Sequence, residues 1–383
     1  MTLGDLVLRG VGWCAVGLLL AACAAERPKP TPLQSYEPKI AGKLVWNASL
    51  GGAGLPFADG ARDALLIPVA RGGTLFVASA AGDLRALQSD TGAELWRTQV
   101  GSALSAGVGS DGRYTAVVTR GNEVVTFDSG RELWRKRVPS SVATPPLVAG
   151  ERVFVMGVDR AVHAFDVLDG RRLWTLQRPG DALTLAQPGV LLAWHNTLLA
   201  GQGPRLAGLD PLRGTVLWET SLASPRGTNE VERLADLVGP AVRVGDRVCA
   251  RAFQSAVACA DVSRGATLWS RNVGGAQAVA GDAELVFGAD ASDRITAWRA
   301  GNGDVAWSNE KLLYRGLSGA LAVGPVVVFG DSEGFVHFLS TSTGEQQLHL
   351  PTDGSAIVGA PVLAGNTLLV TTQGGGLYAF RPN

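Results

Sequence analysis

The chain has 383 residues, of which 46% are hydrophobic and 18% are charged, so it can bury a large core and is too apolar to remain disordered. Its 34 basic residues balance its 34 acidic residues, which argues against the basic surface that nucleic-acid binding requires. Its 50 glycines are spread along the sequence, which is typical of an all-β protein with many tight turns between short strands.

The first 22 residues are predicted to be a signal peptide. Arg9 precedes an uncharged apolar run, Val11 to Leu20, that is too short to span a membrane comfortably. The run continues into Leu20-Ala21-Ala22-Cys23, which resembles the lipobox at which bacterial lipoproteins are cleaved and lipidated on the cysteine. The alternative is an ordinary signal peptide followed by an incidental Cys23.

Residues 23–40 are predicted to be a lipidated cysteine followed by a flexible tether, and residues 41–383 a folded domain. The tether prediction rests on a composition of Pro, Lys, Glu, Thr and Ser between Ala25 and Pro38. Ala24, directly after the cysteine, resembles lipoproteins that are sorted to the outer membrane. Three acyl chains at Cys23 would hold the domain to the membrane durably, whereas a single chain holds only reversibly.

A glycine followed four residues later by tryptophan recurs through the rest of the chain. Successive tryptophans of this repeat are 38 to 51 residues apart, which is close to the length of a four-stranded propeller blade. The repeat predicts an eight-bladed β-propeller, or seven blades if the degenerate last pair is not a separate unit. The pairs are Gly42/Trp46, Gly92/Trp96, Gly130/Trp134, Gly170/Trp174, Gly214/Trp218, Gly265/Trp269, Gly303/Trp307 and the degenerate Gly344/Leu348.

Each unit predicts four short antiparallel strands bounded by Gly, Asp or Asn. After Leu348 the chain has three further predicted strands, within residues 355–381, and no further Gly-to-Trp strand. The strand Lys43 to Ser49 is therefore predicted to complete that last blade and close the ring. The repeated tryptophans are predicted to pack between neighbouring sheets, with a ligand cage as the alternative.

The Gly-x-x-x-Trp pattern after an Asp-containing turn resembles the repeat of the pyrroloquinoline-quinone enzyme superfamily. Eight such repeats behind a lipobox are similar to the BamB family of outer-membrane lipoproteins over essentially the whole mature chain. Two segments make the likeness more specific. They are Asn-Glu-Val-Glu-Arg-Leu-Ala-Asp-Leu at residues 229–237, and Leu183-Thr184-Leu185.

The resemblance implies a non-catalytic scaffold lipoprotein at the outer membrane, facing the periplasm. In that family, loops on one face bind the POTRA domains of BamA within the barrel-assembly (BAM) complex, and nascent outer-membrane β-barrel proteins are a further expected partner. The matching positions give Leu183 and Leu185 as apolar anchors, and Arg233 and Asp236 as polar partners or loop organisers. The alternatives are that the leucines face inward in a strand, and that Arg233 and Asp236 form a purely local pair.

Two residues depart from the family pattern. Ala186 stands where the family has an arginine directly after Leu-x-Leu, and Val238 replaces a second aspartate. Losing these charges would remove charge-assisted contacts or a local ion pair between the two loops, so the partner-binding surface, in which Ala186 is included, is expected to be more apolar.

No catalytic site, metal site or cofactor is expected. The four histidines are predicted to lie in different blades without ligand spacing; they are His163, His195, His337 and His349. Quinone-dependent dehydrogenases of the same superfamily are longer and carry adjacent cysteines, which this sequence lacks. The alternative function is a periplasmic ligand-binding or quinone-dependent redox propeller that uses the central channel.

Cys249 and Cys259 flank a predicted turn and are expected to lie opposite each other on paired strands. A periplasmic protein permits a disulfide between them. Two reduced, buried cysteines remain the alternative.

Overall fold

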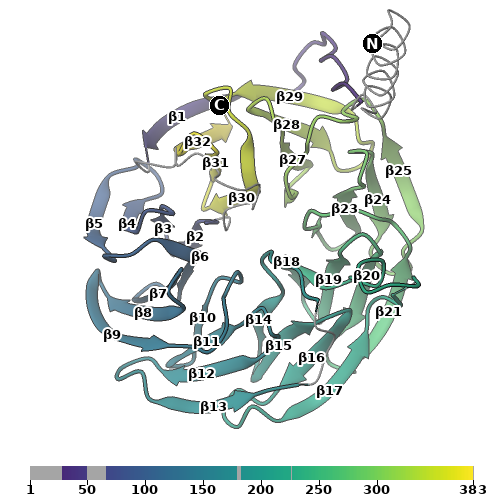
Figure 1. Ribbon diagram of the computed structural model, residues 1–383. Coiled ribbons are helices and arrows are strands. Elements are labelled where there is room, and N and C mark those ends of the chain that lie inside the picture. The colour runs from purple at the N-terminus through teal and green to yellow at the C-terminus, as the bar shows by residue number, and fades with distance from the viewer. Residues whose placement is uncertain (1–27, 50–65, 179–182, 226, 383) are drawn as a thin grey trace, which may run out of the picture.

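The computed structural model describes residues 28–49, 66–178, 183–225 and 227–382. These residues form 32 strands in eight four-stranded antiparallel sheets, which stand around a central axis (Figure 1). The predicted eight-bladed β-propeller is thereby confirmed. The described residues include no helix long and apolar enough to cross a membrane. The predicted signal peptide and Cys23 lie outside the described residues.

Seven blades are each built from four consecutive strands. Blades 1 to 4 are β2 (Val69–Arg71), β3 (Thr74–Ala78), β4 (Asp83–Gln88) and β5 (Glu94–Gln99); β6 (Leu104–Ser110), β7 (Tyr114–Thr119), β8 (Glu123–Asp128) and β9 (Arg131–Arg137); β10 (Leu147–Ala149), β11 (Arg152–Met156), β12 (Val162–Asp166) and β13 (Arg172–Leu176); and β14 (Leu191–Trp194), β15 (Thr197–Gln202), β16 (Arg205–Leu209) and β17 (Val216–Ser221). Blades 5 to 7 are β18 (Leu237–Val244), β19 (Arg247–Ala252), β20 (Ala256–Asp261) and β21 (Ala266–Arg271); β22 (Ala280–Gly281), β23 (Leu285–Ala289), β24 (Ile295–Arg299) and β25 (Val305–Asn309); and β26 (Leu321–Val323), β27 (Val326–Gly330), β28 (Phe335–Ser340) and β29 (Gln346–Pro351).

Blade 8 joins the two ends of the chain. It consists of β30 (Ile357–Ala364), β31 (Thr367–Thr372), β32 (Gly376–Pro382) and, as its outer strand, β1 (Gly42–Ser49). β1 pairs antiparallel with β32, from Gly42 opposite Pro382 to Ser49 opposite Gly376, as Figure 1 shows at the outer rim. The predicted closure of the ring by the first strand is confirmed.

The middle strands of the blades carry the core. In β7 and β15 every residue is buried, because neighbouring blades cover both faces of each sheet. The outer strand β5 instead alternates between exposed and half-buried residues. The core clusters lie between adjacent blades, and one of them contains both Tyr114 of blade 2 and Phe165 of blade 3. Each blade is therefore stabilised by its neighbours, as expected of a radial repeat.

Each repeat tryptophan packs against the glycine of the following blade, which confirms their predicted place between sheets. These glycines have φ between 63° and 84°, and an added Cβ would come closer than 3.0 Å to the indole. At five seams the indole Nε1 also donates to the carbonyl three residues before the glycine, as from Trp134 to Val167 at 2.8 Å. The seams are Trp46/Gly92, Trp96/Gly130, Trp134/Gly170, Trp174/Gly214, Trp218/Gly265, Trp269/Gly303 and Trp307/Gly344.

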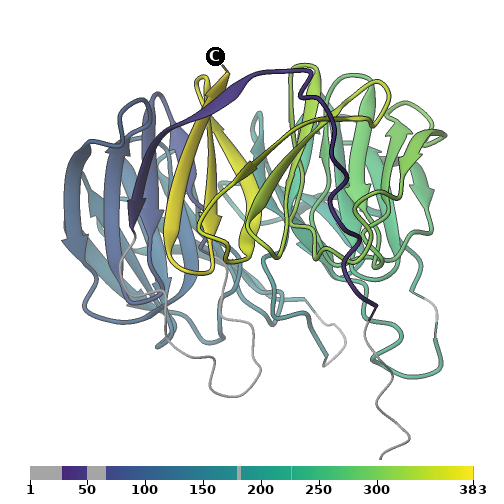
Figure 2. The same ribbon diagram turned by 90° about the horizontal axis from the view of Figure 1, so that it is seen from above.

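The amino-terminal segment is bonded to the blades, contrary to the prediction of a flexible tether. Residues up to 40 were expected to form a flexible tether, but Thr31 N donates to the Leu313 carbonyl at 3.0 Å and Lys39 N to the Gln347 carbonyl at 2.9 Å. Figure 2 shows this segment, in purple, running along the outside of the green and yellow blades toward β1. The segment that contains Thr31 and Lys39 is therefore attached to the propeller. Composition could not reveal this, because the partners lie about 300 residues further along the chain.

Candidate functional site

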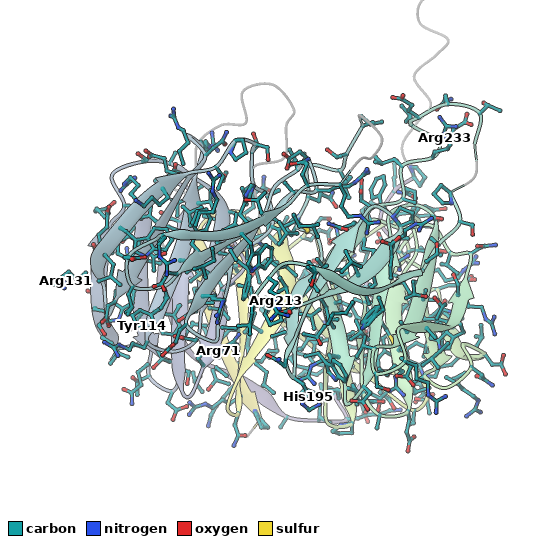
Figure 3. All side chains as sticks on the ribbon, turned by 90° about the horizontal axis from the view of Figure 1, so that it is seen from below. Arg71, Tyr114, Arg131, His195, Arg213 and Arg233 are labelled. Carbon is teal, nitrogen blue, oxygen red and sulfur yellow. A yellow bond between two sulfur atoms is a disulfide. The ribbon has the colours of Figure 1, made fainter. Side chains whose placement is uncertain are left out.

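The two predicted partner-binding segments lie on one face of the ring. Because antiparallel strands alternate in direction, the connection between blades and the turn between the second and third strands lie on the same face. Leu183 to Ala186 belong to the connection from blade 3 to blade 4, and residues 227–236 to the connection from blade 4 to blade 5. Figure 3 shows Arg233 on a loop that projects from one face, with His195 toward the opposite face.

Asp236 holds these two segments together. Its Oδ1 accepts a hydrogen bond from Arg160 Nε at 3.0 Å and its Oδ2 accepts one from the Leu185 backbone N–H at 3.0 Å. Arg160 also donates to the Leu183 carbonyl at 3.4 Å. The Arg160 and Asp236 side chains are only 16% and 14% exposed, so this ion pair is partly shielded from water. Parts of blades 3, 4 and 5 are therefore fixed relative to one another.

Arg160 was not identified from the sequence. It lies in the turn between β11 and β12, far from both family-like segments in the chain. The signal that could have found it is the strand alternation itself, since a turn between the second and third strands of blade 3 must lie on the face that carries the two connections.

The two leucines differ in exposure. Leu183 is exposed, whereas Leu185 is half-buried and lines a cavity of about 30 Å³ together with Met156 and Leu237. Neither residue lies in a strand. Leu183 is thus the surface residue of the pair, and Leu185 fixes its segment to the blades beneath.

Arg233 lies in an exposed turn that is stabilised by its neighbour Glu232. The Glu232 carboxylate accepts from the Thr228 backbone N–H at 2.7 Å and from Asn229 Nδ2 at 2.9 Å. These hydrogen bonds, the one from Thr228 first, hold the pKa of Glu232 below its ordinary value. The Arg233 guanidinium forms no ion pair within the part of the chain that the structure describes. The local Arg233–Asp236 pair is not found, because Asp236 pairs with Arg160 instead.

An exposed apolar residue of the same turn was not singled out from the sequence. Val231 is 72% exposed, two residues before Arg233. Its exposure could not be predicted, because a single valine in a polar segment belongs to no hydrophobic periodicity that would indicate whether it is buried.

The two departures from the family pattern have different environments. Ala186 is exposed and borders the central cavity. Val238 is only 4% exposed and forms an isolated bridge with Gly189. Val238 therefore belongs to the core, and only Ala186 changes the character of the surface.

The central channel contains a cavity of about 570 Å³ that is bordered by Asp290 and Asp293. Asp293 accepts hydrogen bonds from the backbone N–H groups of Gly316 at 2.7 Å and Leu317 at 3.0 Å. Burial raises the pKa of Asp293 above its ordinary value. Among the described residues no group of three or more His, Cys, Asp or Glu is arranged to hold a metal ion.

The predicted separation of the histidines is wrong for one pair. His337 of β28 lies directly opposite His349 of β29 in blade 7, with ring centroids 6.2 Å apart. Residues twelve apart become neighbours because they lie on the two strands of one hairpin. His337 is fully buried and its Nε2 lies 2.8 Å from Asp331 Oδ2. Burial, aided by nearby positive charge, lowers the pKa of His349.

Cys249 and Cys259 are directly opposite each other on β19 and β20. The structure joins them by a disulfide with an S–S distance of 1.94 Å. Both residues are buried within blade 5. The disulfide therefore links the two middle strands of this blade covalently.

Comparisons with known proteins agree with this architecture. The chain matches the family model described as outer membrane protein assembly factor BamB over residues 33–104 and 80–309. It is 39% identical over 378 residues to the protein of that name from Burkholderia pseudomallei, covering 97% of each chain. It is 34% identical over 389 residues to the one from Bordetella pertussis, covering 99% of this chain and 97% of the relative.

Two solved structures show the same fold. The crystal structure of BamB from Moraxella catarrhalis has a TM-score of 0.79 at 21% identity, covering 89% of this chain and 99% of that one. A quinohemoprotein alcohol dehydrogenase from Comamonas testosteroni has a TM-score of 0.64 at 15% identity, covering 89% and 76%. On the strength of the family model and the sequence identities, the chain belongs to the BamB family of outer membrane protein assembly factors.

Proposed function

We propose that this protein is a non-catalytic scaffold in outer-membrane protein assembly, and that it docks on the POTRA domains of BamA within the barrel-assembly complex. The docking surface consists of Leu183 and Ala186 from one connection and Val231 and Arg233 from the next. The observation that carries the proposal is the Arg160–Asp236 pair, which fixes both connections while leaving these residues exposed. The names of the relatives support the assembly role.

The exposed residues have the chemistry of a binding surface. An apolar side chain beside an arginine is a common hot-spot arrangement, and loops that are already held in place lose little entropy on binding. Since Arg233 forms no ion pair with the described residues, its guanidinium is free to bind a carboxylate of the partner. Ala186 extends the apolar part of the surface toward the central channel.

The proposed location is the periplasmic side of the outer membrane, with the lipid on Cys23. The disulfide between Cys249 and Cys259 supports an oxidising compartment. Nascent β-barrel proteins are a further proposed partner. Their strands could add to exposed blade edges by main-chain hydrogen bonds.

The non-catalytic part of the proposal is supported by the central cavity. Asp290 accepts hydrogen bonds from backbone N–H groups of its own turn, and Asp293 accepts them from Gly316 and Leu317 of the connection between blades 6 and 7. The two carboxylates therefore serve this turn and this connection in the first place.

The test is capture of the protein by the purified periplasmic domains of BamA. The variant L183D/R233E changes two exposed residues and is expected to weaken binding at least about tenfold, which corresponds to about 1.4 kcal/mol. The matched control is L212D/R213E, which makes the same chemical changes at two exposed residues in the turn between β16 and β17. Wild-type affinity in L183D/R233E, or an equal loss in the control, would refute this docking surface.

A further inference from the structure

The seam between blades 7 and 8 differs from the other seven. Leu348 takes the place of the tryptophan, and its Cδ2 packs over Gly42. The turn before the glycine is also different, because here it is not continuous. Residues 39–42 come from the amino-terminal segment and lie beside the end of β32, where the other blades have an unbroken turn.

A cavity of about 300 Å³ lies at this seam. Its walls come from both blades and are almost entirely apolar, whereas Asn366 and Arg381 supply side-chain polar groups. The apolar walls include Val328, Phe338, Leu348, Leu350, Leu368 and Phe380. Such a cavity is poorly solvated, because water finds few hydrogen-bond partners in it.

We propose that this cavity binds one aromatic group of about the size of indole. At each of the other seven seams an indole ring fills the corresponding place against the glycine of the next blade. The walls at this seam are built on the same repeat but hold only a leucine. A cavity of about 150 Å³ left by a truncated core side chain is enough to bind benzene, so the larger cavity here has room for a bicyclic ring.

The seam also offers a matching polar group. At five other seams the indole N–H donates to the carbonyl three residues before the glycine. Because the turn is broken at this seam, the strand register gives Pro382 of β32 as the counterpart of that acceptor residue, and Pro382 lines the cavity. An aromatic ligand that carries an N–H group is therefore expected to bind better than a plain hydrocarbon ring.

The ring can come from a free small molecule or from an aromatic side chain of a polypeptide. The chemistry of recognition is the same for both. The experiment therefore uses 5-fluoroindole as the free ring and a short glycine-flanked peptide with a single 5-fluorotryptophan as the side chain. Fluorine NMR detects either ligand without interference from the native tryptophans of the protein.

The decisive variant is L348W, which fills the cavity with the residue that the other seams use. We expect saturable binding of one equivalent of 5-fluoroindole to the wild type, and binding at least about tenfold weaker to L348W. The matched control is L217W, which introduces a tryptophan at a leucine that is 55% exposed on β17. This control is expected to bind like the wild type.

Two further measurements establish that L348W is folded and where the ligand binds. Circular dichroism and thermal unfolding verify that L348W is folded, and nuclear Overhauser effects from the bound ring to the Leu348 and Leu368 methyl groups place the ligand in the wild-type cavity without any variant. Equal affinity of folded L348W, absence of those effects, or saturable binding of octanol with none of fluoroindole would each overturn the proposal. Binding of the peptide identifies a side chain as the source, and binding of fluoroindole alone identifies a free molecule.

Discussion

Two arginine–aspartate pairs on the same face of the ring attach chain segments in opposite ways. In the docking pair, Arg160 lies in a turn between second and third strands and Asp236 in a connection between blades. In the second, the anchoring pair, Arg315 lies in the connection and Asp331 in the turn. Each pair thus joins a connection between blades to a turn between second and third strands, but the arginine and the aspartate have exchanged positions.

The two pairs differ in burial and in what they hold. Arg315 and Asp331 are 2% and 0% exposed, and Arg315 donates to the Thr31 carbonyl at 2.9 Å, so this pair holds the amino-terminal segment of its own chain. The docking pair is partly exposed and holds a connection whose outer residues remain open. Burial therefore distinguishes the pair that holds the amino-terminal segment from the pair beside the proposed docking surface.

Breaking the anchoring pair should have the larger effect. Among the described residues, R315M leaves the buried Asp331 with only His337 as a side-chain partner, and removal of one member of a buried pair typically costs about 3–5 kcal/mol. The free energy of unfolding in urea should fall by that amount. Proteolysis near Thr31 should also become faster, because the segment loses its attachment. A loss no larger than that of R160M would contradict the comparison.

Acid should act on the anchoring pair in a predictable direction. Burial opposes ionisation of Asp331, but hydrogen bonds from His337, backbone N–H groups and Arg315 outweigh it and hold the pKa of Asp331 below its ordinary value. A lowered folded-state pKa gives stability that is present above the unfolded value, about 4, and is lost as the pH falls through the folded value. The unfolding free energy of the wild type should therefore fall more between pH 6 and pH 2.5 than that of D331N. Parallel pH profiles would show that Asp331 does not contribute.

Breaking the docking pair should cost least. R160M removes a partly exposed ion pair, so the expected loss in unfolding free energy is about 1 kcal/mol. The effect on local hydrogen exchange should be clearer than the effect on the free energy of global unfolding. Hydrogen exchange at the backbone amide of Leu185 should become faster in R160M and remain unchanged in R315M. Faster exchange in both variants would mean that the two pairs are not independent.

Most of the fold could be predicted because it repeats. The Gly-to-Trp spacing identified eight blades, and the surplus strand at residues 43–49 identified how the ring closes. The repeat did not predict which histidines lie close together. His337 and His349 lie on either side of the degenerate unit's turn, and only the hairpin register brings them together.

The candidate site was predictable only in part. Leu183 and Asp236 were found through likeness to a family, and the structure brings their two segments together. Arg160 and Val231 were missed because no local pattern relates them to these segments. The attachment of Thr31 to Arg315 could not be predicted either, since a proline-rich stretch gives no sign of a partner in a distant blade.

The attachment at Thr31 determines how the molecule bears mechanical load. β1 pairs only with β32, so tension applied directly to its first residue would peel it from the sheet one pair at a time. A pull on the amino-terminal end instead reaches Thr31 first, where Leu313 and the buried Arg315 grip the backbone. The force is thus transferred to the connection between blades 6 and 7, and β1, which closes the ring, does not bear it.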